Sequence, residues 1–201
     1  MKIAILGFGN VGQILANIFE NAGHEVFIGV RDPANNTSRL PTFSFQAAAQ
    51  QADIIALAIP YTACAKVLNE IVSETTDKII IDNTNPLKED WSPLLLGQEN
   101  SAAEEIARIA PRAHVVKAFN TIFADVMGKP ERGAQKITAF IAGDNEEAKQ
   151  KIIALAESVG YDPLDVGRLT SARYLESMAH LNIEVAIGQS GGTNAAFIYS
   201  H

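Results

Sequence analysis

One stretch near the amino terminus decides the fold of this chain: Ile3-Ala4-Ile5-Leu6-Gly7-Phe8-Gly9-Asn10-Val11-Gly12. Its first four residues form a short apolar run, which predicts a buried strand. The run leads directly into G-x-G-x-x-G, and apolar residues then recur at helical spacing as far as Phe19. Gly23 is a typical helix end, and residues 25–30 read as a second strand. The stretch therefore predicts a strand–helix–strand unit with a glycine turn at its first junction.

The same alternation continues along the chain. Apolar runs predict strands at 43–45, 53–59, 78–82, 114–119, 136–141 and 161–164, and helical spacing predicts helices at 62–72, 101–109, 145–159 and 171–187. Alternating strands and helices predict a doubly wound α/β fold in three layers, with helices on both faces of a mostly parallel sheet. The 201 residues are expected to form one domain, 1–201, that ends in a helix and a glycine-rich tail. The longest irregular segment, 83–100, is expected either to be functional or to contain a short helix.

Composition narrows the class of protein. The chain is 47% hydrophobic and 19% charged, which indicates a folded globular domain. Its net charge of −7 argues against nucleic acid as a partner, and it has no apolar run of the ~18 residues that span a membrane. The single cysteine, Cys64, cannot form an internal disulfide, which favours a reducing cytoplasm. Scattered histidines and the absence of C-x-x-C or H-E-x-x-H argue against a metal site.

The glycine turn predicts a dinucleotide site. Gly7 is expected to permit the tight turn, Gly9 to leave room for a pyrophosphate, and Gly12 to let helix and strand lie close together. The free N–H groups and positive end of the helix would face the phosphates. The competing nucleotide-triphosphate motif lacks its lysine, because Gln13 and Ile14 follow Gly12. The other turn residues, Phe8, Asn10 and Val11, belong to the same predicted site.

The end of the second strand indicates which dinucleotide binds. NAD sites usually place a carboxylate there to bind the ribose hydroxyls. Here the position is held by Gly29 or Val30, and Arg31 follows. A guanidinium can pair with the 2′-phosphate of NADP and stack on adenine. Val30 and Arg31 therefore predict NADP(H) in preference to NAD(H).

The reaction end of the site is expected where further strands end, because ligands of doubly wound sheets bind outside the carboxyl ends of the strands. These strand ends contribute apolar groups that exclude water and amides that hydrogen bond to a carboxamide or a second ligand. The predicted residues are Ala58, Ile59 and Pro60, then Asn83, then Ala118, Phe119 and Asn120.

No acid–base pair is evident at these strand ends. His24 and His114 lie before or at the start of strands, so we expect structural roles for them, and His180 on the last helix is the histidine that could face a pocket. Reduction of a ketone needs a proton donor, whereas hydride exchange between two ring cofactors needs mainly alignment. Gly188-Gln189-Ser190-Gly191-Gly192 matches the nucleophile motif G-x-S-x-G, but it follows a helical pattern, so we interpret it as a glycine-rich turn.

Stretches along nearly the whole chain resemble one family, the NADPH-dependent reductases of the deazaflavin coenzyme F420, and more distantly the cytosolic domain of transmembrane metalloreductases. The similar stretches include 3–12, 24–29 with Arg31, 58–61, 82–87, 101–105, 116–121, 142–144 and 172–176. The sequence departs from the family pattern at Phe8 and Val30, where hydroxyl residues are common, and at Asn35 and Asn36, where the family often has a lysine.

The resemblance implies a Rossmann-like domain, an NADP site at the glycine turn and Arg31, and a second ring cofactor stacked on the nicotinamide. That second ligand would be F420 or a flavin (FMN or FAD), and family members are commonly homodimers. The expected function is an NADP(H)-dependent oxidoreductase of the cytoplasm that transfers hydride by alignment, without a catalytic side chain. Two alternatives remain: an NADPH-sensing binding protein without catalysis, and a small-substrate dehydrogenase whose pocket is completed by dimerisation.

Overall fold

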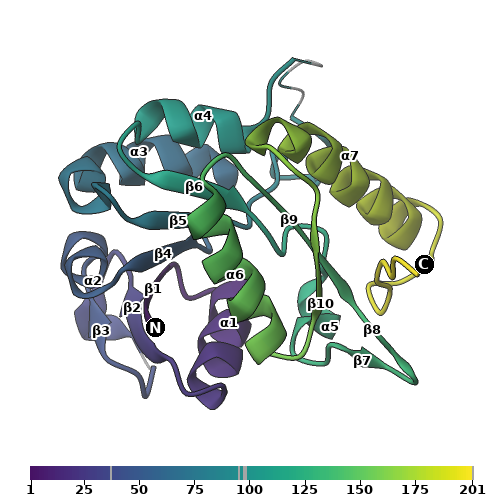
Figure 1. Ribbon diagram of the computed structural model, residues 1–201, viewed down its shortest axis with the longest axis horizontal. Coiled ribbons are helices and arrows are strands. Elements are labelled where there is room, and N and C mark those ends of the chain that lie inside the picture. The colour runs from purple at the N-terminus through teal and green to yellow at the C-terminus, as the bar shows by residue number, and fades with distance from the viewer. Residues whose placement is uncertain (37, 95, 97–98, 201) are drawn as a thin grey trace.

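The computed structural model describes residues 1–36, 38–94, 96 and 99–200. Figure 1 shows its elements, whose bounds follow in chain order: β1 Lys2–Leu6, α1 Asn10–Asn21, β2 Glu25–Gly29, β3 Thr42–Phe43, α2 Phe45–Gln51, β4 Ile54–Leu57, α3 Tyr61–Ile71, β5 Ile79–Asp82, α4 Ala102–Ile109, β6 His114–Lys117, α5 Ala124–Met127, β7 Glu131–Arg132, β8 Gln135–Lys136, β9 Thr138–Gly143, α6 Glu146–Ser158, β10 Asp162–Asp165 and α7 Ala172–Ile183.

Eight strands form one sheet in the order β10-β9-β6-β5-β4-β1-β2-β3. The six strands from β6 to β3 run parallel to their neighbours, while β9 pairs antiparallel with β6 and parallel with β10. The predicted, mostly parallel α/β sheet is confirmed. The reversed pair at one edge is a feature that strand-by-strand patterns did not reveal.

Two apolar cores lie on opposite faces of this sheet, which gives the three expected layers. One core joins the sheet to α1, α5 and α6, and the other joins it to α2, α3 and α4. Strands buried on both faces read as continuous apolar runs, and Ile79-Ile80-Ile81 of β5 is such a run, at most 6% exposed.

Several short elements were not predicted. Helix α2 follows β3, where Ser44 caps it by accepting a hydrogen bond from the N–H of Ala47, at 3.2 Å. Helix α5 and the β7–β8 hairpin lie between β6 and β9. The last helix, expected at 171–187, is α7 followed by a π-helical turn, Glu184–Gly188. The G-x-S-x-G segment follows that helical turn and not a strand, so its interpretation as a turn is confirmed.

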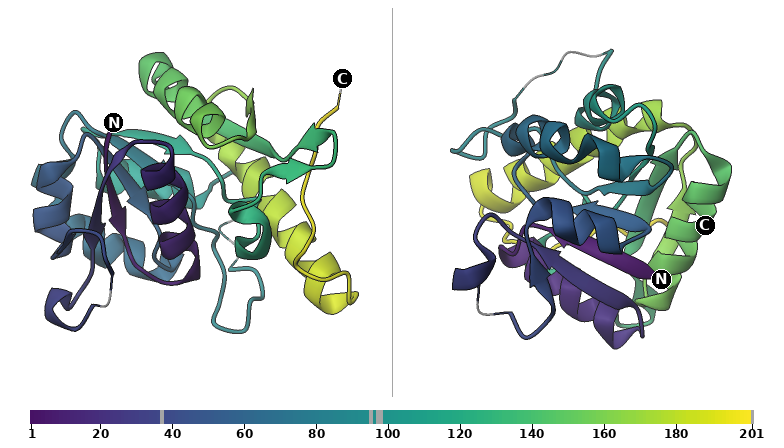
Figure 2. Two further views of the ribbon diagram at one scale, coloured as in Figure 1. Left: turned by 90° about the horizontal axis from the view of Figure 1, so that it is seen from below. Right: turned by 90° about the vertical axis from the view of Figure 1, so that its left-hand side faces the viewer.

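Helix α7 and the loop after β5 border the carboxyl ends of the parallel strands. In Figure 2 (left) α7 crosses beside the sheet and the loop projects from the body as an extended hairpin. The segment 83–100, predicted to be irregular, holds no helix in its described part, which is 83–94, 96, 99 and 100. Within the described ranges, no helix is long and apolar enough to cross a membrane, and no group of three or more His, Cys, Asp or Glu side chains is placed to hold a metal ion.

Candidate functional site

The three glycines of the first turn differ in what surrounds them. Gly7 has φ +104° and a Cβ there would lie 2.3 Å from the carbonyl oxygen of Ala58, while a Cβ on Gly12 would lie 2.2 Å from that of Gly7. Gly9 has an ordinary φ of −77° and no atom within 4 Å of its Cβ position. Gly7 and Gly12 are therefore required by the fold, whereas the space at Gly9 is open to a ligand.

Helix α1 begins beside this open space without a cap. Its N-cap residue is Gly9, no side chain accepts its first N–H groups, and its first turn holds no acidic residue. The first N–H groups of a helix carry partial positive charge and need acceptors. The turn thus offers an anion a set of unpaired donors at the point where Gly9 leaves room.

Three adjoining cavities follow the carboxyl ends of the strands from β2 to α7. The first, of about 490 Å³, lies between the end of β2 and α3; it shares Ile59 and Pro60 with the second, of about 790 Å³. The second extends from Gly9 and Asn10 past the end of β4 to Asn83, and it shares Asn10, Val11, Asn83 and Asn85 with a third of about 320 Å³ below α7. Together they form one groove, which is long enough to hold an extended dinucleotide and a second ligand.

Eleven of the fifteen predicted site residues line this groove. Val30 and Arg31 line the first cavity, Ala58 and Gly9 the second, and Phe119 and Asn120 the third. The other five each line two of the cavities: Asn10, Val11, Ile59, Pro60 and Asn83. The remaining four do not line it. Gly7 and Gly12 shape the turn, Ala118 is fully buried in the core, and Phe8 packs against that core.

Arg31 differs from the other arginines of the described chain. Each of the other six bonds to an acidic side chain or, for Arg132, to Asn194. Arg31 is exposed in the first cavity and has no such partner among the described residues. A guanidinium that no internal carboxylate neutralises is available to an anion. Lys66 and Glu70 of α3 line the same cavity with charges of opposite sign, so Arg31 leaves it with one positive charge in excess.

Three asparagines form the wall between the second and third cavities. The amide N–H groups of Asn85 donate to the carbonyl of Asn120 at 2.8 Å, and those of Asn120 donate to Asn85 Oδ1 at 2.9 Å and to the carbonyl of Leu175 at 3.0 Å. Asn83 donates to the carbonyl of Leu57. The side-chain oxygens of Asn83 and Asn120 are buried and have no partner among the described residues. Buried acceptors without a donor are uncommon, so these two oxygens are candidates for a partner that this part of the chain does not supply.

Phe119 reaches the groove with its backbone and not with its ring. Its φ is +63°, a backbone conformation that residues other than glycine rarely adopt, and the residue is 1% exposed. The ring packs against Phe19 and Tyr161, with centroids 6.2 and 5.6 Å apart. This turn directs the aromatic ring into the core while the peptide of Phe119 lines the third cavity.

A buried cluster of charges beneath the wall was not predicted. The Lys117 ammonium, fully buried, donates to Asp82 Oδ2 at 2.8 Å, Glu176 Oε1 at 2.8 Å and the carbonyl of Thr84 at 2.7 Å. Glu176 also accepts from the first N–H groups of α4, at Ala102 and Ala103. Burial is the largest influence on the pKa of Glu176, which is raised. The cluster joins β5, β6, α4 and α7 directly below the asparagine wall.

A signal for this cluster was present in the sequence. Asp82 and Lys117 each end an otherwise apolar strand, where an isolated charge would be costly unless it is paired. Two charges of opposite sign at the ends of neighbouring strands are therefore a reason to expect an ion pair. Glu176 lay outside this reasoning, because only the packing of α7 brings it to the same place.

None of the histidines discussed from the sequence, nor Cys64, lines the groove in the part of the chain that the structure describes. His24 bonds to Ser158 and His114 begins β6, so both lie away from the carboxyl ends, as expected. Half-buried His180 interacts with the carbonyl of Pro86, and burial lowers its pKa. Burial raises the pKa of the Cys64 thiol to about 12, so it is not a thiolate nucleophile.

Comparison with known proteins assigns this arrangement to a family. Residues 2–86 match the family model described as NADP oxidoreductase, coenzyme F420-dependent. The F420-dependent NADP reductase of Methanothermobacter thermautotrophicus is 30% identical over 210 residues, which cover 93% of this chain and 90% of the relative. A crystal structure from Arthrobacter sp. FB24, proposed to be an F420-dependent NADP-reductase, superposes over all of both chains with a TM-score of 0.90 and 29% identity.

A second group of relatives is longer. The metalloreductase STEAP3 of Rattus norvegicus is 30% identical over 181 residues, which cover 88% of this chain but 36% of that protein. This chain therefore spans about a third of the metalloreductases it matches.

Proposed function

The chain belongs to the family of coenzyme F420-dependent NADP oxidoreductases; on that premise we propose that it is an NADP-dependent oxidoreductase and transfers hydride between the nicotinamide of NADP(H) and a second ring cofactor, F420 or a flavin. The observation that carries the proposal is the continuous groove, which leads from Arg31 past Gly9 to a further cavity beyond the asparagine wall. With one cysteine and a nicotinamide cofactor, we place this reaction in the cytoplasm.

The first half of the groove fits NADP. The open space at Gly9 and the uncapped N–H groups of α1 suit the pyrophosphate. Arg31, which has no partner among the residues that the structure describes, would hold the 2′-phosphate, and the adenine would lie in the first cavity beside Val30 and Pro60. The departures from the family at Phe8 and Val30 leave Arg31 as the main phosphate ligand on this loop.

The second half of the groove fits the nicotinamide and its partner ring. Ile59 and Pro60 offer an apolar floor, and the unpaired oxygens of Asn83 and Asn120 suit the N–H groups of a carboxamide. NADPH, when bound, supplies a hydride from C4 of the nicotinamide to a ring in the third cavity. The residues of the wall orient the two rings and exclude water, which is the contribution that hydride transfer between cofactors needs from a protein.

Oxidation of NADPH by purified protein tests the proposal. Absorbance at 340 nm should fall when F420, FMN or FAD is added and remain constant without an acceptor. Absence of turnover with all of these acceptors would contradict the proposal. Tight NADPH binding in the same sample would then favour the NADPH-sensing alternative.

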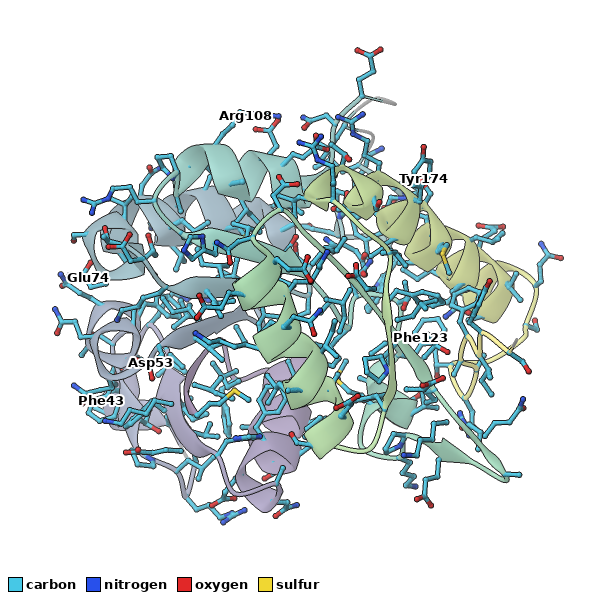
Figure 3. The ribbon with its side chains drawn as sticks, in the orientation of Figure 1. Phe43, Asp53, Glu74, Arg108, Phe123 and Tyr174 are labelled. Atoms are coloured by element: carbon cyan, nitrogen blue, oxygen red, sulfur yellow. The ribbon has the colours of Figure 1, made fainter. Side chains whose placement is uncertain are left out.

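We also propose that the protein forms a homodimer through α7. Tyr174, Leu181 and Val185 are 73%, 60% and 46% exposed, and their spacing places them on one face of α7 and the turn that follows. Figure 3 shows Tyr174 projecting outward from this helix. A two-fold interface uses the same patch on both copies, and an apolar stripe is complementary to itself.

Light scattering after size exclusion tests this assembly. The wild-type chain should have twice the mass of one chain, and Leu181→Asp should be monomeric. Val72→Asp, an equally apolar exposed site (42%) on another surface, serves as the control and should remain dimeric. A monomeric wild-type protein would refute the dimer without affecting the hydride-transfer proposal.

A further inference from the structure

The only tryptophan of the chain lies at the junction of two cavities. Trp91 lines both the second cavity, where the nicotinamide is placed, and the third cavity, where the second ligand is placed. It is nevertheless 59% exposed, so the core does not hold it. A large exposed aromatic side chain at the edge of a binding site has apolar area that a ligand can cover.

The loop that carries Trp91 is closed on itself. Leu87 and Pro93 form an antiparallel bridge, Lys88 N–H donates to the carbonyl of Ser92 at 2.9 Å, and the Asp90 carboxylate accepts from the N–H and the hydroxyl of Ser92 at 3.0 and 2.6 Å. These bonds form a short hairpin with Trp91 near its tip. The backbone at Trp91 is thus held by the loop's own hydrogen bonds.

Trp91 also has a strained backbone. Its φ is +67°, in the left-handed region where non-glycine residues are rare, and of the four described non-glycine residues with positive φ, two line the third cavity: Trp91 and Phe119. Strain of this kind persists only where the surroundings enforce it, and it gathers at binding sites.

The base of the loop is fixed by contacts with other parts of the molecule. Asn85 and Asn120 bind one another through both amides, and Pro86 accepts from Leu94 N–H at 2.8 Å and interacts with His180 of α7. The attachment holds the loop against β6 and α7, so the indole is presented at a constant place over the groove.

The charges around the third cavity indicate what kind of ligand enters it. Asp125 is the one charged side chain among the described residues that line the cavity, and it accepts a hydrogen bond from Thr193. The rest of the lining is amide, hydroxyl or apolar. Phosphate and carboxylate groups are usually bound by Arg, Lys or unpaired N–H groups. This lining holds no Arg or Lys, and the uncapped N–H groups at the start of α1, at Asn10 and Val11, are those assigned above to the pyrophosphate of NADP.

We propose that Trp91 is a positioning residue against which the ring of the second ligand stacks, and that the third cavity recognises the uncharged ring of that ligand and not its anionic tail. This inference rests on the proposed function. The inference adds a statement about ligand specificity to the proposed function: acceptors with and without a charged tail should bind with similar strength.

Because Trp91 is the sole tryptophan, quenching of its fluorescence reports the binding of a ring ligand near this residue. The protein is saturated with NADP⁺, which does not absorb the indole emission, and titrated with two pairs of probes: riboflavin with FMN, and the deazaflavin riboside with F420. Saturable quenching by at least one pair, with dissociation constants within about threefold inside that pair, is the expected result. Absence of quenching by all four probes would overturn the inference, as would a member with a charged tail that binds tenfold tighter than its neutral counterpart.

Kinetic variants separate positioning from folding. Trp91→Ala should raise KM for the ring acceptor about tenfold, as loss of one aromatic stacking partner does, and leave KM for NADPH unchanged, while Trp91→Phe should keep most of the affinity. Asp90→Ala is the matched loop variant, because it removes the Ser92 hydrogen bonds but keeps the indole. An unchanged acceptor KM in Trp91→Ala would refute the role of Trp91. Saturable quenching without turnover would instead refute hydride transfer and leave the ring site intact.

Discussion

The two ends of the groove are built in different ways. The end that is proposed to hold the phosphates comes from the first βαβ unit, where Gly9, Arg31 and the start of α1 lie within 23 residues and have unpaired donors. The end that is proposed to hold the two rings comes from β4, β5, β6 and α7, whose polar groups are mostly paired with one another. The first end therefore offers unpaired groups to a ligand, whereas the polar groups of the second end mainly hold one another in place. Mutations at the first should therefore change binding, and mutations at the second should change stability.

The largest effect is expected at the second end. Lys117→Met leaves the Asp82 and Glu176 carboxylates buried without a cation, which should cost about 3–5 kcal/mol of unfolding free energy. Urea denaturation measures the loss. Lys151→Met, which removes an exposed pair with Glu147, is the control and should cost less than about 0.5 kcal/mol.

The same variant can be made more informative. Adding Asp82→Asn and Glu176→Gln removes the unpaired charges, so the triple variant should recover part of the stability lost by Lys117→Met. If the triple variant is less stable than Lys117→Met alone, packing and not charge pairing holds this end of the groove.

At the first end, Gly9→Val should weaken binding strongly without harming the fold. A Cβ at Gly9 meets no protein atom, yet the side chain occupies the space of the pyrophosphate, so NADPH affinity should fall about 100-fold, or about 2.8 kcal/mol. Isothermal titration and urea denaturation on the same sample measure both quantities. Gly12→Val is the counterpart: its Cβ would lie 2.2 Å from the Gly7 carbonyl oxygen, so the protein itself should lose stability. Equal urea midpoints for the two variants would contradict this division.

Arg31→Ala should weaken NADPH binding by about 10- to 100-fold, because it removes hydrogen bonds to a charged phosphate. NADH lacks that phosphate, so its binding should be nearly unchanged. Parallel titrations with both cofactors measure the ratio. Arg39→Ala, whose guanidinium is already paired with Glu20, provides the control. Equal losses for both cofactors would show that Arg31 does not bind the 2′-phosphate.

The smallest effect concerns the ion pair that fastens α7 to α4. Arg173 binds Glu104 through two nitrogens, at 2.6 and 2.9 Å, and this pairing lowers the pKa of Glu104. The unfolded chain then binds the proton more readily, so the stabilisation is present above the ordinary pKa of about 4.5 and is lost as the pH falls through the lowered value. Arg173→Ala should cost about 1 kcal/mol at pH 7 and progressively less below pH 4.5. A constant difference between wild type and variant down to pH 3 would contradict this assignment.

The difference between the two ends also explains what sequence reasoning found. The glycine turn and Arg31 were predicted because a strand, a turn and a helix in succession leave a local pattern. Asn83 and Asn120 were predicted from their positions after apolar runs, because parallel strands end at one edge. Trp91 and Asp125 were not singled out, because they lie in a loop and in a short helix that have no periodicity to read.

The buried cluster and the reversed strands depended on contacts between distant residues. Lys117 reaches Asp82 across 35 residues and Glu176 across 59. The antiparallel pairing of β9 with β6 follows the α5 and β7–β8 segment, whose elements of two to four residues are too short for a pattern. Phe119 illustrates the same limit, because the sequence placed it at the end of an apolar run while the direction of its ring depends on a backbone turn.

By itself, the sequence determined the α/β class, the order of the main elements, the dinucleotide turn and the place of Arg31 after the second strand. Each of these depends on residues close together in the chain. Only the tertiary structure decided that the asparagine wall rests on a buried ion cluster, that α7 closes the groove, and that Trp91 lies at the junction of two cavities. Side-chain pairing and cavity shape arise from packing between elements, and neither leaves a periodic trace along the chain.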